Sequence, residues 1–242
     1  MNSLPPMIFD MFRKKVNLLI LDDDEIIRES LVKKFSSPLF NTVPARSLDQ
    51  AFEAIGVTLT GWHCLIVDLD LGKKASGLTL FRKFPGYPFA IILSGLRSMT
   101  MAAEAMHLGA CAIVDKDPSA LETLYSKVLE TAALGFVLNG RSSPHMDTFR
   151  LLQDSTIDSV DAWANRSGVT LRKLYRICEV HPPLTPHFAL ALYRSICFLL
   201  RLTENTAGSS SFEIASQFSP EEQNACLSWI EYIMLNYKGG LT

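Results

Sequence analysis

The stretch Val16-Asn17-Leu18-Leu19-Ile20-Leu21-Asp22-Asp23-Asp24 is a short, mainly apolar run that ends in three consecutive aspartates. A continuous apolar run of this length is typical of a strand buried on both faces of a parallel sheet. Adjacent carboxylates at the end of such a strand repel one another and lose water, and a bound cation would offset both costs. Oxygen ligands of this kind favour Mg²⁺. The aspartates could equally form a solvated acidic turn that begins the next helix, and this stretch alone leaves both interpretations open.

Three later apolar runs also end in polar side chains. His63–Asp68 ends in an aspartate, Phe89–Gly95 ends in a serine and a glycine, and Cys111–Lys116 ends in a lysine. Helix-like stretches lie between these runs, so the chain alternates strand and helix, as in an open parallel sheet with helices on both faces. The carboxyl ends of the strands form the ligand crevice in such sheets. We therefore expect one site to contain Asp22, Asp23, Asp68, Ser94 and Lys116.

This ordered set of residues resembles the receiver domain of two-component response regulators, over roughly residues 15–135. The resemblance implies an α/β fold, a flavodoxin-like, doubly wound, five-stranded parallel sheet. It also implies a role for each residue of the set. Asp68 would be the phosphoacceptor, Ser94 the switch hydroxyl and Lys116 the partner of the phosphoryl group. Mg²⁺ would be held by Asp22, Asp23, Asp68 and the main-chain carbonyl of Asp70.

The side chains suit this chemistry by themselves. Asp68 is a carboxylate nucleophile that can form an aspartyl phosphate. Mg²⁺ and Lys116 would neutralise charge on the transferred phosphoryl group, and Ser94 could donate a hydrogen bond to it after phosphorylation. Such a protein is a switch rather than an enzyme, because it catalyses only its own phosphorylation and dephosphorylation. A degenerate receiver that no longer accepts phosphate is the alternative.

The sequence departs from the receiver pattern at three places. Ile113 stands where the family usually has an aromatic residue, so a switch based on an aromatic side chain is absent. Lys116 is followed by Asp117 and only then by Pro118, so a cis peptide bond after the lysine is not expected. The loop after Asp68, residues 69–77, lacks the usual proline and looks one residue long. These changes bear on signalling geometry more than on phosphorylation.

The remaining sequence predicts a second domain. The chain has 242 residues, 48% of them hydrophobic, which is enough for two cores. A helix over residues 118–134 would end the receiver at Gly135, and the turn-rich segment that follows reads as a linker. The predicted division is an N-terminal extension (1–14), the receiver (15–135), a linker (136–146) and a smaller all-α output domain (147–242).

The second domain contains a predicted helix-turn-helix at about residues 159–180. Its first helix would cover residues 160–168, and its second Leu171–Val180. The outward face of the second helix would present Thr170, Arg172, Lys173 and Arg176, a row that could enter a major groove. Two helices of an ordinary bundle with a solvated basic face would give the same pattern.

Residues 159–202 also resemble the DNA-binding domain of AraC-type regulators, on the stretch 162–176, Pro183-Leu184-Thr185-Pro186 and the helix that follows. This region carries six basic and two acidic residues, whereas residues 140–242 have a net charge of −1. A second helix-turn-helix at 212–220 lacks the turn glycine and precedes Glu221-Glu222, so we do not expect it to read DNA. The apolar helix after Ser219 is expected to be core or a dimer contact.

These observations predict a phosphorylation-switched response regulator of a two-component system, which regulates transcription. Its partners would be a sensor histidine kinase or phosphotransfer protein, promoter DNA and a second copy of itself, because one reading helix needs a partner on DNA. The rival is a receiver with a helical protein-interaction output that binds no DNA. Five scattered cysteines and the absence of a signal peptide or membrane span predict a cytoplasmic protein.

Overall fold

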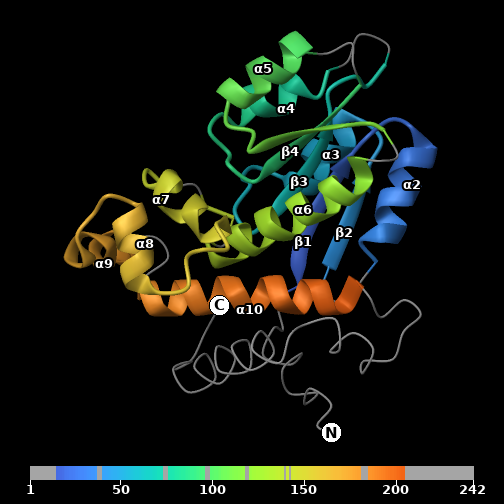
Figure 1. Ribbon diagram of the computed structural model, residues 1–242. Helices are drawn as coiled ribbons and strands as arrows, with labels where there is room; N and C mark the ends of the chain where they lie inside the picture. The colour runs from blue at the N-terminus through green and yellow to red at the C-terminus, as the bar shows by residue number, and fades with distance from the viewer. Residues whose placement is uncertain are drawn as a thin grey trace, which may run out of the picture. The chain divides into compact units, whose positions relative to one another are not determined.

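The computed structural model describes residues 15–36, 40–72, 76–95, 99–117, 120–138, 140–141, 143–180 and 185–204 (Figure 1). The described residues fall into two compact units, which we describe separately: one from Val16 to Met146 and one from Asp147 onward. Within the described residues, no helix is long and apolar enough to cross a membrane. The expected N-terminal extension (1–14) and everything after Glu204 lie outside these residues.

The first unit is a five-stranded, all-parallel sheet with the order β2-β1-β3-β4-β5. This order is that of flavodoxin-like folds, so the predicted fold class is confirmed. The strands are β1 (Val16–Leu21), β2 (Phe40–Ala45), β3 (Cys64–Asp68), β4 (Ala90–Ser94) and β5 (Ala112–Asp115). The central strands β3 and β4 are buried along their whole length, as their unbroken apolar sequences predict.

Helices cover both faces of this sheet (Figure 1). The rings of Phe35 and Tyr125 stack at 5.2 Å and join the end of α2 (Glu25–Lys34) to α6 (Ala120–Val137). Across the sheet, α3 (Leu48–Ile55), α4 (Leu78–Lys83) and α5 (Met99–His107) form the second layer. Neighbours in this layer are linked by Lys83 over the Phe52 ring and by the Arg82–Glu104 ion pair.

Helix α6 runs three residues further than the sequence predicted. Gly135 was expected to stop it, but a side chain at Gly135 would overlap the main-chain carbonyl of His63, so this glycine lets the helix pack closely on the start of β3. The next residues, Phe136 to Leu138, are buried although the predicted linker began at 136. Contacts with the sheet therefore stabilise helix beyond a residue that usually ends one.

The described part of the second unit is helical. Its elements are α7 (Met146–Arg150), the short 3-10 helix η1 (Leu151–Gln153), α8 (Val160–Arg166), α9 (Leu171–Val180) and α10 (Pro186–Glu204). Trp163 of α8 is fully buried and donates its indole N–H to the Thr148 carbonyl at 2.8 Å. The Arg194 guanidinium of α10 holds the loop before α8 through the carbonyls of Asp154 and Ile157, at 2.8 and 2.7 Å.

Candidate functional site

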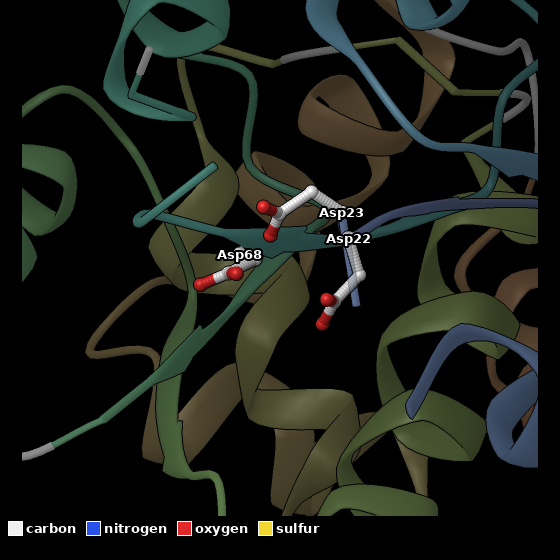
Figure 2. Close-up of side chains that lie close together, drawn as sticks. All are labelled: Asp22, Asp23 and Asp68. Atoms are coloured by element: carbon white, nitrogen blue, oxygen red, sulfur yellow. The ribbon is translucent and has the colours of Figure 1, made fainter. Parts of the chain in front are cut away.

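Three carboxylates meet at the carboxyl ends of β1 and β3. One ligand oxygen from each of Asp22, Asp23 and Asp68 lies within 4.8 Å of the others, and we call these residues the acidic cluster (Figure 2). The cluster forms because β1 and β3 are hydrogen-bonded neighbours whose chains both leave the sheet at this edge. Asp22 and Asp68 are buried, at 0% and 2% exposure, and Asp23 is exposed. The sequence prediction that these three aspartates meet is therefore confirmed.

Lys116, at the end of β5, supplies the positive charge beside the acidic cluster. Its Nζ donates a hydrogen bond to Asp68 Oδ2 at 2.6 Å and lies 2.9 Å from Asp22 Oδ2. The second contact is an ion pair without hydrogen-bond geometry, so Asp22 Oδ2 is a buried carboxylate oxygen that makes no hydrogen bond to any described residue. One lysine thus faces two buried carboxylates.

Burial and this shared lysine shift the titration of all three groups. Loss of water around Asp68 raises the pKa of its carboxyl from 3.8 to about 6, although Lys116 opposes the shift. Desolvation likewise raises the pKa of Asp22, again against the pull of Lys116. Burial acts to lower the pKa of Lys116, but its interactions with the carboxylates of Asp68 and Asp22 outweigh that effect and raise it. The lysine stays charged while the carboxylates are held in an unfavourable environment.

The third aspartate of the opening stretch has a different task. Asp24 is the N-cap of α2, and its carboxylate accepts the main-chain N–H groups of Ile26 and Ile27 at 2.9 and 3.2 Å. The interpretation of these residues as a helix-initiating turn is therefore correct for Asp24. It does not apply to Asp22, which is buried and whose Oδ1 accepts the Asp24 N–H at 2.9 Å within the turn.

The loop after β3 approaches the cluster closely through two glycines. Gly72 has a positive φ of +62°, and a Cβ added there would lie 3.0 Å from Asp23 Oδ2. A Cβ at Gly77 would overlap the carbonyl oxygen of Asp68 and lie 2.8 Å from a methyl of Val67. The sequence analysis did not single out either glycine as part of the site. Their position in the loop that follows the central aspartate was the available signal.

Two other residues of the predicted site lie at its edge. The Asp70 main-chain N–H donates to Asp68 Oδ1 at 3.1 Å, and the Asp70 carboxylate accepts from the Gly72 N–H at 3.3 Å. The Asp70 side chain is outside the acidic cluster, which agrees with a role that uses only its carbonyl. Ser94 is buried at the end of β4, where its hydroxyl donates to the Gly95 carbonyl at 2.9 Å. Ile113 is 41% exposed on β5.

The chemistry of the acidic cluster fits a divalent cation. All of its donors are carboxylate oxygens, the ligand type that Mg²⁺ and Ca²⁺ prefer. The cluster has three carboxylates and Lys116 pairs with two of them, so the site holds excess negative charge. Asp22 and Asp68 are buried, and Asp22 Oδ2 makes no hydrogen bond to any described residue. A cation would satisfy this oxygen and relieve the repulsion between the carboxylates.

The second unit has two short helices at the positions of the predicted helix-turn-helix. Helices α8 and α9 are joined at Gly168, whose φ is +64°, and their bounds agree closely with the prediction. Arg172, Lys173 and Arg176 are exposed on α9, while Leu174, Ile177 and Cys178 of the same helix are buried. Thr170 is exposed, but its hydroxyl accepts the Lys173 N–H at 3.3 Å and caps the helix. The candidate second helix-turn-helix (212–220) lies outside the described residues.

Comparisons with known proteins return solved structures only. No protein-family model matches the sequence, and no curated protein matches it. A response regulator from Burkholderia pseudomallei, with a phosphorylated aspartic acid and a calcium ion, is 21% identical, with a TM-score of 0.41, over 64% of this chain and 94% of that chain. Full-length FixJ from B. japonicum is 18% identical, with a TM-score of 0.44, over 84% of this chain and 97% of that one. The Francisella response regulator 1452 receiver domain is 22% identical, with a TM-score of 0.41, over 49% and 97%.

Proposed function

We propose that the chain is a response regulator of a two-component system, which accepts a phosphoryl group on Asp68. The observation that carries the proposal is the position of this carboxylate: Asp68 is buried, hydrogen-bonded to Lys116 at 2.6 Å, and clustered with Asp22 and Asp23. A buried carboxylate beside a lysine and further acids suits attack on a phosphorus atom. Sensor histidine kinases or phosphotransfer proteins, as phosphohistidine donors, are the proposed partners.

In the proposed reaction, an oxygen of Asp68 forms a bond to phosphorus while the bond from phosphorus to the donor nitrogen breaks. Asp68 must be ionised to attack, and Lys116, which remains charged, favours that form and faces the incoming phosphoryl oxygens. Mg²⁺ bound by Asp22 and Asp23 would neutralise phosphoryl charge. Ser94 then has to leave the Gly95 carbonyl to bond a phosphoryl oxygen, which makes its hydroxyl a candidate switch.

The proposal is tested by phosphoryl labelling of the purified protein with a small-molecule acyl phosphate and Mg²⁺. We expect the wild type to take up a base-labile label, as an acyl phosphate is, and no acid-stable label. Asp68→Asn should lose the base-labile label. Asp70→Asn is the matched control, because its carboxylate lies outside the acidic cluster. Stoichiometric labelling of Asp68→Asn would overturn the assignment of the phosphoacceptor.

We further propose that the second unit binds promoter DNA as a homodimer and thereby regulates transcription. The supporting observation is that Arg172, Lys173 and Arg176 are exposed side by side on α9, while the apolar face of that helix packs inside its own unit. A helical protein-interaction output remains the rival. The exposed basic face favours DNA, because arginine and lysine on a protruding helix suit base edges and phosphates.

A further inference from the structure

Arg28 reaches back from α2 to the turn that carries the acidic cluster. Its Nη1 donates to the main-chain carbonyl of Asp22 at 2.9 Å and to that of Asp23 at 3.3 Å. The Arg28 side chain is half-buried, and its main-chain N–H donates to the Asp24 carbonyl at 2.9 Å as part of the helix. One guanidinium therefore contacts the carbonyls of two consecutive residues of the cluster.

These two carbonyls precede the helix, so the main-chain N–H groups of α2 do not bond to them. The other restraints on this turn act elsewhere: the Asp22 N–H donates to the Ala45 carbonyl, and the Asp24 N–H donates to Asp22 Oδ1. The direction of the peptide planes at Asp22 and Asp23 decides where the attached carboxylates point. Arg28 is the side chain that binds both planes at their oxygens.

We propose that Arg28 is a positioning residue for the cation site: it holds the Asp22 and Asp23 peptide groups and thereby aims both carboxylates at the cation. The inference rests on the proposed function, because it assumes that the acidic cluster binds Mg²⁺. Groups that orient metal ligands in this indirect way typically contribute a large part of metal affinity.

A purely electrostatic role for Arg28 predicts the opposite effect. A positive guanidinium near a cation site repels the cation, so removing it would strengthen Mg²⁺ binding. Loss of positioning would instead weaken binding, since the flexible turn would have to be ordered by the metal. The sign of the change in Mg²⁺ affinity therefore separates the two roles.

The test is isothermal titration of the purified full-length protein with Mg²⁺ alone, for the wild type, Arg28→Met and Arg28→Lys. We expect Arg28→Met to bind Mg²⁺ about tenfold more weakly. Arg28→Lys should lie between, because an ammonium can donate to a carbonyl but is a shorter, single-point donor. Arg82→Met is the matched control: this arginine is exposed, pairs with Glu104 and is no part of the turn, so its affinity should equal the wild type.

A second readout separates positioning from general destabilisation. In the absence of metal, amide hydrogen exchange at Asp23 and Asp24 should be faster in both Arg28 variants, with the thermal midpoint close to that of Arg82→Met. Mg²⁺ binding by Arg28→Met that is as tight as wild type, or tighter, overturns the inference, as does Arg28→Lys binding no better than Arg28→Met. A wild type that binds no Mg²⁺ would instead remove the proposed function, and the inference with it.

Discussion

Lys116 Nζ lies 2.6 Å from Asp68 Oδ2, although the two residues are 48 positions apart. Lys116 directly follows β5 and Asp68 ends β3, with β4 between those strands. The same Nζ lies 2.9 Å from Oδ2 of Asp22, which directly follows β1. A single cation thus bridges the ends of three strands and faces two buried carboxylates. The site is short of positive charge, and this shortage makes its stability sensitive to pH, to substitution and to bound metal.

Replacing Asp68 by asparagine should stabilise the metal-free protein at pH 7.5. Burial raises the pKa of Asp68 from 3.8 to about 6 in the folded state, so between these values the folded protein binds more protons than the unfolded chain. The stability from this group is fully present below pH 3.8 and is lost as the pH rises through about 6. Asparagine resembles the protonated acid and does not lose this stability as the pH rises. We therefore expect the free energy of unfolding of Asp68→Asn at pH 7.5 to exceed that of the wild type by about 1–3 kcal/mol.

Urea unfolding with a metal chelator measures this difference across pH. The gap between Asp68→Asn and the wild type should be large at pH 7.5 and shrink toward pH 4.5, where Asp68 is protonated in the folded wild type. Asp22, whose pKa is also raised by burial, shares Lys116 with Asp68, so the difference between the two curves includes the response of Asp22 to the loss of the Asp68 charge. If Asp68→Asn were less stable than the wild type at pH 7.5, the site would not be short of positive charge.

Replacing Lys116 by methionine should have the opposite effect on stability. The change leaves the buried carboxylates of Asp22 and Asp68 without their shared cation, at a cost of about 3–5 kcal/mol in the metal-free protein. Lys127→Met is the control, because Lys127 pairs with Glu130 on an exposed helix face and should change stability by less than about 1 kcal/mol. Mg²⁺ should restore more stability to Lys116→Met than to the wild type, and an equal gain in both would argue against a cation site here.

Replacing Gly77 by alanine should damage the site through its main chain. The added methyl group would overlap the Asp68 carbonyl oxygen and press on Val67, so we expect a loss of about 1–3 kcal/mol and slower phosphoryl labelling. Gly95→Ala is the matched control, since no side-chain or main-chain atom of the described residues beyond its chain neighbours lies within 4 Å of a Cβ added at Gly95. Chemical unfolding and labelling rates check both variants; equal behaviour of the two would show that the loop can move away from Asp68 freely.

Replacing Arg172 or Arg176 by alanine should each weaken specific DNA binding by about 1–3 kcal/mol. Both side chains are exposed on α9, so the folded state should not change. Arg150→Ala removes the same charge from α7 of the second unit, where Arg150 pairs with Asp147, and should leave sequence preference intact. Selection of genomic fragments at near-physiological salt is the measurement. No enrichment by the wild type, with or without phosphorylation, would favour the protein-interaction rival.

Much of the first unit could be predicted because buried parallel strands leave a strong local signal. The run Val16–Leu21 is apolar enough to mark β1 to the residue, and the runs that end at Asp68, Ser94 and Lys116 mark three further strands within about one residue. β2 (Phe40–Ala45) was implied only by the predicted five-stranded fold. It lies at the sheet edge, buries only its end residues Phe40 and Ala45, and contains Pro44, so its own sequence is far less distinctive.

The sequence by itself determined which chemical groups end the strands, because strand order and strand polarity bring carboxyl ends to one edge. It could not determine how those groups share charge. That Lys116 faces both Asp22 and Asp68 depends on distances across the sheet. That Asp24 caps α2 instead of joining the cluster, and that Arg28 binds the carbonyls of the turn, depend on the path of the chain between β1 and α2. The same holds for Gly135, where packing against His63 continued a helix through a residue that favours stopping it. Local sequence sets the preference of each segment for helix, strand or turn. Contacts between segments far apart in the sequence decide where the chain departs from that preference.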